Sequence, residues 1–238
     1  HEYVQSEVKP FQSSSTPQDL NVRAYKYALL SGDSEKKVAL KLKNKDGHQS
    51  VISVSRSKYG DEKYPSTNSF NIIEGKFGYF KTNSFSSNET VEYFKGLVPK
   101  LDKLEGLIID IRNNGGGSSD VGFEILSYLT EKTLVGSTSF TRLNLSVERA
   151  WGNTSTLWKS LGNSTFRANL EHTFQKPVIV LAGAQTFSAA EDFLIAFKQS
   201  NRGVVIGETT GGSSGQPLSF SLPAGGTARV CVKRDKYQ

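Results

Sequence analysis

Cysteine, methionine and histidine are scarce in this chain of 238 residues. It has one cysteine, three histidines and no methionine. A single cysteine excludes an internal disulfide and a zinc site built from cysteines. This residue, Cys231, stands in an apolar alternation and is expected to be buried in a strand. A domain of this size usually has several methionines, so their absence predicts that residues are missing from the printed sequence and that some spacings are contracted.

Long apolar runs and clustered charges are lacking as well. No run approaches the roughly 20 residues needed to span a membrane, and no signal peptide is visible. The net charge is +6, but the Lys and Arg residues are spread along the chain and do not cluster with aromatic residues. This spread argues against nucleic-acid binding. The length suits one large domain or two smaller ones.

One stretch combines a predicted buried strand, a serine and a helix. The apolar run 177–182 precedes Gln-Thr-Phe-Ser-Ala-Ala-Glu-Asp-Phe at 185–193, and a helix is predicted over 189–198. Ser188 therefore lies at a strand-to-helix turn, where backbone N–H groups are unpaired. Such a position suits a nucleophile whose attack creates an oxyanion. Alternatively, Ser188 only caps the helix and Glu191 completes a capping box.

A second stretch also begins with a predicted buried strand. Residues 104–117, Leu-Glu-Gly-Leu-Ile-Ile-Asp-Ile-Arg-Asn-Asn-Gly-Gly-Gly, read as a buried strand that ends in a glycine loop. Together with Ser188–Glu191, and with Gly-Glu-Thr-Thr-Gly-Gly at 207–212, the segment Asp110–Gly117 resembles the S41 serine peptidases, the C-terminal processing and tricorn-core family. The resemblance covers roughly residues 76–237. Each motif is weak alone, but the ordered set is specific.

The resemblance implies an α/β fold with a crotonase-like ββα core of the ClpP/crotonase type. It implies a serine endopeptidase that forms an acyl-enzyme at Ser188, acts on peptides or protein C-termini and needs no cofactor or metal. It also implies a periplasmic, cell-envelope or secreted location. Two alternatives stay open: a catalytically impaired, peptide-binding homologue of the same fold, and another acyl-transfer enzyme on this core, because a fold does not fix a function.

The resemblance assigns further residues around Ser188. The backbone N–H of Ala189 is one oxyanion donor, and Gly115 or Gly116 of the glycine loop supplies the other. Glycine suits this place because it lets the backbone approach a substrate closely, although these glycines also suit a tight strand-to-helix turn. The remaining matches to the family are supporting positions: Glu191, Thr210 and Gln216.

The general base is not evident from the sequence. Processing peptidases of the family have a lysine at the position of Ser213. The tricorn-like branch has a histidine where Lys81 stands, and its distal glutamate would lie beyond Gln238. Lys81 is therefore either an unusual general base or only an exposed strand residue. If it is not the base, the base lies among residues missing from the sequence, or the chain is an inactive homologue. His172 suits a base near neutral pH, but the family gives this position no role.

Other motifs are weaker. Residues 211–215 fit the Gly-x-Ser-x-Gly nucleophile elbow, but that elbow must open a helix, and here Gln-Pro and an alternating pattern follow. Asp110 without His or Cys partners is a poor metal site. The glycine loop at 113–117 lacks the lysine of a phosphate loop, which argues against nucleotide binding.

The chain is predicted to have three parts: a partial PDZ-like module at 1–57, a linker at 58–75, and an S41 catalytic core at 76–238 that is C-terminally incomplete. The first part reads as a helix from Pro17 to Leu30 followed by two strands around a turn at 45–47. This order is similar to the C-terminal half of a PDZ domain, which binds extended peptides. The alternative is a structural module with no ligand.

Strands alternating with helices in the third part predict α/β layering. The expected strands are 76–85, 104–111, 177–182, 203–207, 218–222 and 228–232, and the expected helices are 86–97, 120–130 and 189–198. Ser86 is the predicted cap of the first helix. Residues 131–170 are mixed, and Trp151 and Trp158 within them either cover a substrate cleft or pack.

Overall fold

The computed structural model describes residues 1–56, 66–143, 146–152, 157–169 and 172–237. The chain divides into two compact units, residues 1–66 and 67–238. Residues 58–65 of the predicted linker at 58–75 lie outside the described residues, and the rest of it does not only connect domains. Residues Asn68–Ile73 form a strand that pairs with the next strand of the second unit, so the linker prediction is too long at this end.

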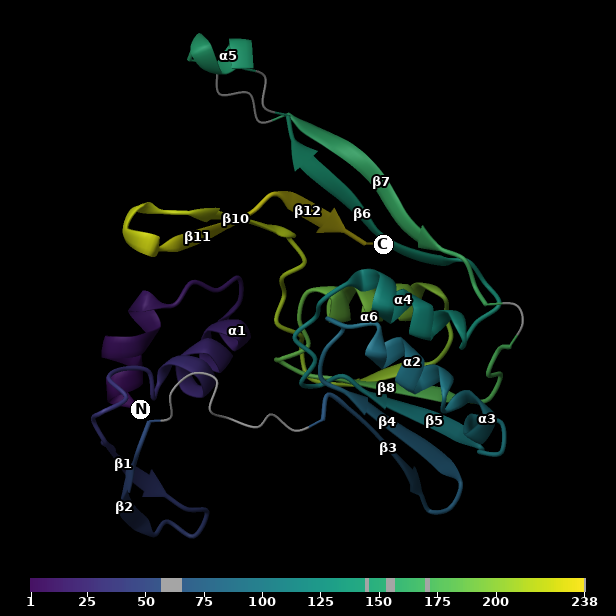
Figure 1. Ribbon diagram of the computed structural model, residues 1–238, viewed down its shortest axis with the longest axis horizontal. Coiled ribbons are helices and arrows are strands. Elements are labelled where there is room, and N and C mark those ends of the chain that lie inside the picture. The colour runs from purple at the N-terminus through teal and green to yellow at the C-terminus, as the bar shows by residue number, and fades with distance from the viewer. Residues whose placement is uncertain (57–65, 144–145, 153–156, 170–171, 238) are drawn as a thin grey trace. The chain divides into compact units, whose positions relative to one another are not determined.

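The first unit consists of short helices and one hairpin (Figure 1). Its elements are η1 Val4–Val8, η2 Lys9–Phe11, α1 Pro17–Val22, η3 Arg23–Ala28, β1 Val38–Lys43 and β2 Gln49–Val54. Pro17 opens α1, and the Thr16 hydroxyl accepts the N–H of Asp19 at 3.2 Å, as expected of a helix start. The predicted helix and hairpin are therefore confirmed, whereas the PDZ-like character of the module stays a prediction.

The second unit is built on a five-stranded sheet with the order β3-β4-β5-β8-β9. Its strands are β3 Asn68–Ile73, β4 Phe77–Thr82, β5 Gly106–Asp110, β8 Val178–Ala182 and β9 Val204–Gly207. The pair β3–β4 is antiparallel and the other pairs are parallel. The apolar runs of β5 and β8 occupy the central positions, as expected because parallel strands are buried on both faces. The prediction of a mixed α/β fold is confirmed.

A layer of helices packs on one face of this sheet and carries most of the core. Its helices are α2 Glu89–Lys95, α3 Val98–Leu101, α4 Ser119–Ser127 and α6 Ala189–Gln199. Phe193 and Phe197 of α6 are fully buried, and the Phe193 ring lies 5.6 Å from that of Phe85. The predicted cap of α2 is wrong: the helix begins after Asn88, because the Ser87 hydroxyl accepts the first free N–H, that of Glu89.

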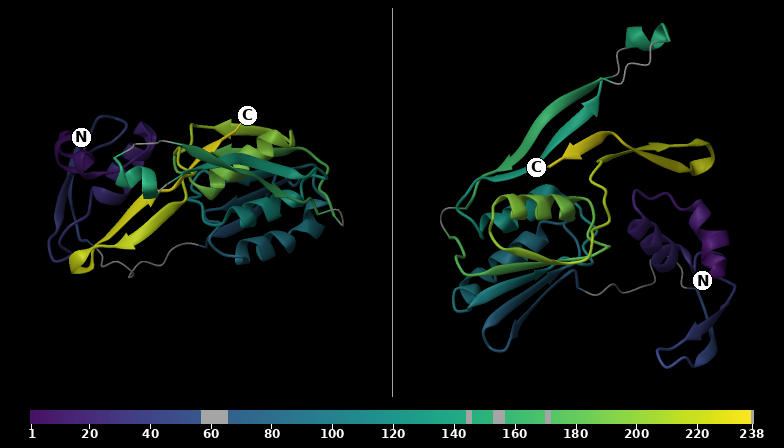
Figure 2. Two further views of the ribbon diagram at one scale, coloured as in Figure 1. Left: turned by 90° about the horizontal axis from the view of Figure 1, so that it is seen from above. Right: turned by 180° about the vertical axis from the view of Figure 1, so that it is seen from behind.

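A second, three-stranded sheet covers the helices α4 and α6 on their other side (Figures 1 and 2). It is antiparallel, with the order β12-β6-β7, and comprises β6 Leu134–Arg142, β7 Trp158–Phe166 and β12 Lys233–Lys236. The short helix α5 Ser146–Ala150 lies between β6 and β7 in the chain. The sequence did not predict β6 and β7, because their many polar residues and one glycine in each obscure the strand pattern.

The end of the described chain is a separate hairpin followed by β12. The hairpin pairs β10 Pro217–Ser221 with β11 Thr227–Cys231 around the 3-10 turn η4 Pro223–Gly225. Cys231 lies in a strand as predicted, but its predicted burial is wrong, because the residues of this hairpin are largely exposed. Trp151 is 77% exposed and so is not a packing residue. Within the described residues, no helix is long and apolar enough to cross a membrane.

Candidate functional site

Three loops that carry the predicted motifs meet at one edge of the five-stranded sheet. The parallel strands β5, β8 and β9 end at this edge, and the loops 111–117, 183–188 and 208–216 follow them. The carboxyl ends of parallel strands are the usual place for a site in an open α/β sheet. The motifs are far apart in the sequence but adjacent in the fold.

Ser188 has an unusual backbone conformation at the start of α6. Its φ and ψ are 56° and −124°, a region that residues with a side chain rarely adopt. Such a conformation costs on the order of 1–3 kcal/mol and persists only where the surroundings impose it. Here the Ser188 N–H donates to the carbonyl of Ser213 at 3.0 Å and to the Glu191 carboxylate at 3.0 Å. The side chain is half-buried and thus reachable from solvent.

Glu191 joins the serine turn to the loop that follows β9. Its Oε2 accepts the N–H groups of Ser188 and Ser213, at 3.0 and 2.8 Å. Its Oε1 accepts the Thr210 hydroxyl at 2.7 Å and the Gly212 N–H at 2.8 Å. The expected supporting positions of Glu191 and Thr210 are thus in direct contact. The carboxylate does more than complete a capping box, because three of its four donors come from another loop.

The glycine loop after β5 is shaped by the buried side chain of Asn114. Its amide nitrogen donates to the Thr82 carbonyl at 3.3 Å, and its Oδ1 accepts the Gly116 N–H at 2.9 Å. The Asn114 carbonyl accepts the N–H of Phe187, the residue before the serine, at 3.0 Å. Asn114 therefore connects β4, the glycine loop and the serine turn. No role was predicted for Asn114, although it stands in the glycine-loop motif at 110–117.

Gly116 lies directly against the serine turn. A Cβ atom built on Gly116 would lie 2.8 Å from the Ser188 Cβ and 3.0 Å from the Ala189 N. Its φ of 96° is a second reason for glycine at this position. The loop and the turn thus converge as the sequence predicted. A side chain at Gly116 would collide with the main chain and the Ser188 side chain of this turn.

The two candidate oxyanion donors of the glycine loop, the N–H groups of Gly115 and Gly116, differ in whether they already form a hydrogen bond. The Gly116 N–H is used by Asn114, whereas the N–H groups of Gly115 and Ala189 donate to no described residue. Gly115 is exposed, and a Cβ built on it would meet nothing within 4 Å. Gly115 in the glycine loop and Ala189 at the start of α6 therefore each have an N–H group without a partner among the described residues.

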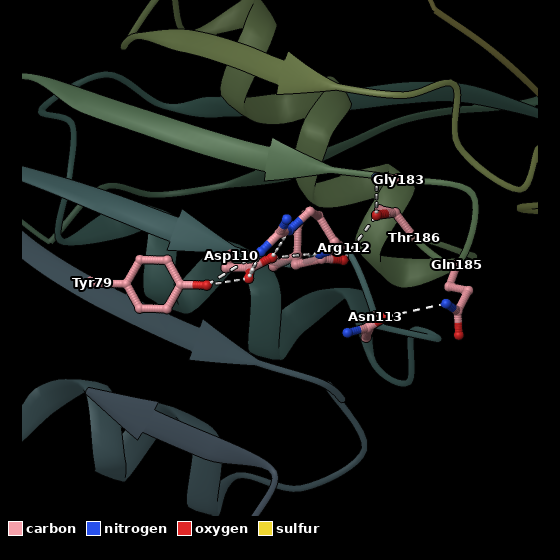
Figure 3. Close-up of polar contacts among 8 residues, drawn as sticks. Tyr79, Asp110, Arg112, Asn113, Gly183, Gln185 and Thr186 are labelled. Atoms are coloured by element: carbon pink, nitrogen blue, oxygen red, sulfur yellow. Dashed lines mark hydrogen bonds and ion pairs between the residues drawn. The ribbon is translucent and has the colours of Figure 1, made fainter. Parts of the chain in front are cut away.

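Thr186 fixes the path of the chain between β8 and Ser188 (Figure 3). Its hydroxyl is fully buried, donates to the Ile111 carbonyl at 2.8 Å and accepts the Gly183 N–H at 3.0 Å. Nearby, the Gln185 amide donates to Asn113 Oδ1 at 3.1 Å. These bonds tie the loop after β8 to the loop after β5. A threonine in a loop motif gives no signal of such a role in the sequence.

Asp110, at the end of β5, accepts hydrogen bonds from Arg112 and Tyr79 (Figure 3). The Arg112 Nε and Nη2 donate to the two carboxylate oxygens at 2.9 and 2.8 Å, and the Arg112 N–H donates at 3.0 Å. Burial alone would raise the pKa of Asp110, but these hydrogen bonds and the Arg112 charge outweigh it. The pKa of Asp110 is therefore about 2, below the ordinary 3.8. Burial and the Asp110 charge raise the pKa of the Tyr79 hydroxyl.

The candidate bases have different surroundings. Lys81, one residue before the end of β4, is half-buried and forms no ion pair with a described residue. His172 precedes β8, at the opposite edge of the sheet, and its Nε2 lies 3.2 Å from Asp102 Oδ1. This location separates His172 from Ser188. In the described part of the chain, no titratable side chain is hydrogen-bonded to the Ser188 hydroxyl.

The rival elbow at 211–215 has no helix after it. Residues 211–216 form a loop that leads into β10. Ser213 contributes main-chain atoms to the contacts with Ser188 and Glu191. Gln216, expected to support the site, is exposed and has a φ of 45°. The structure brings together Ser188, the glycine loop, Glu191 and Thr210, but not Gln216.

The comparison with protein families agrees with this geometry. The model of peptidase family S41 matches residues 76–237. A carboxyl-terminal-processing protease of Synechocystis sp. is 29% identical over 167 residues, which are 68% of this chain and 33% of that protein. The carboxy-terminal processing protease CtpA of Bacillus subtilis is 27% identical over 213 residues, 87% of this chain and 40% of that protein. The chain thus spans about a third of the length of the curated relatives it matches.

Solved structures share the fold. A putative peptidase from Parabacteroides merdae is similar with a TM-score of 0.57 and 24% identity, covering 75% of this chain and 55% of that one. The photosystem II D1 C-terminal processing protease is similar with a TM-score of 0.55 and 22% identity, covering 87% and 52%. At these identities the likeness concerns the fold alone.

The Asp110 contacts predict a specific loss of stability in acid. A carboxylate whose pKa is lowered by folding stabilises the fold above its unfolded pKa, near 4, and this contribution is lost as the pH falls to about 2. The shift corresponds to about 2 kcal/mol. Asp110→Asn should therefore lower the free energy of unfolding at pH 7 and flatten its decline between pH 4 and pH 2, as measured by urea denaturation.

Glu105→Gln is the matched control for that measurement. Glu105 directly precedes β5, and its 59% exposed side chain lies 3.5 Å from an exposed lysine. Exposed ion pairs contribute little to stability. In Glu105→Gln the free energy of unfolding should therefore decline between pH 4 and pH 2 as it does in the wild type. An equally steep decline in Asp110→Asn would contradict the assignment.

Proposed function

Because this chain belongs to peptidase family S41, we propose that it is the catalytic part of a serine peptidase that cleaves peptides or protein C-termini through an acyl-enzyme at Ser188. The observation that carries the proposal is the contact of the serine turn with the glycine loop at Gly116. The names of the relatives, which are processing proteases, support the substrate class.

The proposed reaction uses the geometry of the turn. The Ser188 hydroxyl attacks the carbonyl carbon of the scissile bond, and its proton passes to the general base. The carbonyl oxygen becomes an oxyanion, which accepts hydrogen bonds from the N–H groups of Ala189 and Gly115. The leaving amine takes a proton, and water then hydrolyses the ester. The strained conformation of Ser188 places the nucleophile and the Ala189 N–H on the same turn.

The finer assignments of fold and location belong to the same proposal. A crotonase-like core is supported by the mainly parallel sheet with a layer of helices and a second sheet. The PDZ-like character of the first unit rests on its order of helix, strand, turn and strand. A location outside the cytosol rests on the family resemblance.

The first test of the proposal is active-site labelling. A fluorophosphonate probe should label the wild-type protein, and Ser188→Ala should abolish the label, because the probe needs an activated serine. Ser213→Ala serves as the control for the rival elbow and should keep the label, since Ser213 contributes only main-chain atoms to the site. A folded wild-type protein that takes up no probe would favour the peptide-binding homologue. Labelling that is lost only in Ser213→Ala would identify Ser213, and not Ser188, as the nucleophile.

The glycine loop gives a second test with a matched pair. Gly116→Ala should reduce labelling by on the order of a hundredfold, because its methyl group would lie against the Ser188 turn and block one oxyanion donor. Gly115→Ala should keep most of the labelling, because its methyl group meets no atom within 4 Å and its N–H is retained. Comparable rates for the two variants would argue against the oxyanion site described above.

The base is tested separately. Lys81 is the candidate within the described chain, because it is half-buried near the carboxyl end of β4 and has no acidic partner there. If it accepts the serine proton, Lys81→Met should slow labelling at least a hundredfold and abolish its rise with pH, while the melting temperature stays close to that of the wild type. An unchanged pH profile would exclude Lys81 as the base.

A further inference from the structure

A buried ionic cluster lies between the helix that begins after Ser188 and the three-stranded sheet. On β12 the side chains alternate: Lys233 and Asp235 are half-buried, whereas the neighbouring residues are exposed. The Lys233 Nζ lies 3.0 Å from Asp235 Oδ2, and the two side chains are 17% and 3% exposed. On β6, the Ser139 hydroxyl donates to Asp235 Oδ1 at 2.7 Å. Charged residues on a short edge strand thus point into the protein.

Asp192 presents a second carboxylate to this cluster from the first turn of α6. Its Oδ2 accepts the Ser119 hydroxyl at 2.6 Å, but its Oδ1 is buried and has no hydrogen-bond partner among the described residues. Burial raises the pKa of Asp192; the Ser119 bond and the Lys233 charge oppose this, while the charges of Asp235 and Glu191 add to it. Lys233 is therefore paired with Asp235 on its own strand, and its charge also acts on the Asp192 carboxylate of α6.

The cluster is linked to Ser188 through the main chain. The N–H groups of Val232 and Lys233 donate to the Gly215 carbonyl at 3.1 and 3.2 Å. Two residues before Gly215, the Ser213 carbonyl accepts the Ser188 N–H. The segment 213–215 therefore lies between β12 on one side and the serine turn on the other. Any displacement of β12 from α6 would change the path of this segment.

We propose that Lys233 is a positioning residue for Ser188. Its ammonium group pairs with Asp235, and both side chains contact Ser139 of β6, the strand that packs on the helix α6 that carries Asp192. This anchoring of β12 maintains the hydrogen bond between the Ser213 carbonyl and the Ser188 N–H. The ion pair with Asp235 assigns Lys233 to positioning and not to proton transfer. The functional consequence rests on the proposed role of Ser188, whereas the structural link does not.

The test compares Lys233→Met with Lys236→Met. Both variants remove one positive charge from β12, but Lys236 is exposed. Removing the cation from a buried pair leaves carboxylates uncompensated, so Lys233→Met should speed hydrogen exchange of the Ser188 and Val232 amides by about tenfold. Fluorophosphonate labelling should slow by a similar factor at every pH. Lys236→Met should match the wild type in both measurements.

Two further variants separate positioning from other roles. Lys233→Arg keeps the charge and should restore most of the labelling rate, with an unshifted pH profile. Asp192→Asn removes the charge on the helix side and should speed exchange at Ser188 by a smaller factor. In the double variant with Lys233→Met, the free-energy effect on hydrogen exchange at Ser188 should be smaller than the sum of the two single effects, because the two residues act on one contact.

Equal exchange at Ser188 in the wild type, Lys233→Met and Lys236→Met would overturn the proposal. So would a pH profile shifted in Lys233→Arg, which would make Lys233 a proton acceptor. Should Lys233→Met fail to fold, Asp192→Asn decides the point, since wild-type exchange at Ser188 in that variant contradicts the docking role. A wild-type protein without labelling would end the proposed function alone, because hydrogen exchange does not depend on catalysis.

Discussion

The Glu191 carboxylate is the interaction on which the rest of the site depends. It accepts four donors from two loops, and one of them is the N–H of Ser188 itself. Hydrogen bonds to a charged acceptor are roughly twice as strong as neutral ones. Four such bonds can offset the backbone strain at Ser188, which is on the order of 1–3 kcal/mol. Besides them, the described loop after β9 contacts the serine turn through the Ser213 carbonyl, which accepts the Ser188 N–H, and through the Gly211 N–H, which donates to the Thr186 carbonyl at 2.9 Å.

Most contacts between the loops around this carboxylate involve main-chain groups. The serine turn contacts the glycine loop through the Phe187 N–H and the Asn114 carbonyl, and Gly116 lies against it without a side chain. The Thr186 hydroxyl joins the same two loops from the buried side. Main-chain contacts of this kind tolerate little displacement, because hydrogen bonds weaken steeply when their geometry departs from the optimum. In the described chain, this network leaves the N–H groups of Gly115 and Ala189 without a partner.

Two charged contacts stabilise the surroundings at a greater distance. Asp110 and Arg112 close the end of β5 on the sheet side, and Lys233 with Asp235 lies on the side of the second sheet. Both pairs are at least partly buried, so the loss of one partner would leave an uncompensated charge. The helices α4 and α6 between the sheets contribute the apolar part, with Phe193 and Phe197 fully buried. The turn that carries Ser188 therefore begins a helix that is packed on both faces.

Regular patterns in the sequence predicted the parts of the fold that follow from local rules. The runs in β5 and β8, the helix α6 and the turn at Ser188 were evident, because central parallel strands are continuously apolar and helix starts have marked residues. The strands β6 and β7 were not evident, because their polar and apolar residues do not alternate regularly. The exposure of Cys231 was not evident either, because an apolar alternation does not show whether another layer covers the strand.

The sequence by itself determined which residues could form the site: a serine at a helix start, a glycine loop after a strand, and the spacing that matches the family. Only the tertiary structure decided which of their atoms meet. It placed the Gly116 N–H on Asn114 and left that of Gly115 free, gathered three distant donors on Glu191, and separated His172 from Ser188 by the length of the sheet. The physical reason is that hydrogen bonds between these loops depend on which strands, distant in the sequence, become neighbours in the sheet, whereas local periodicity indicates only the type of each element.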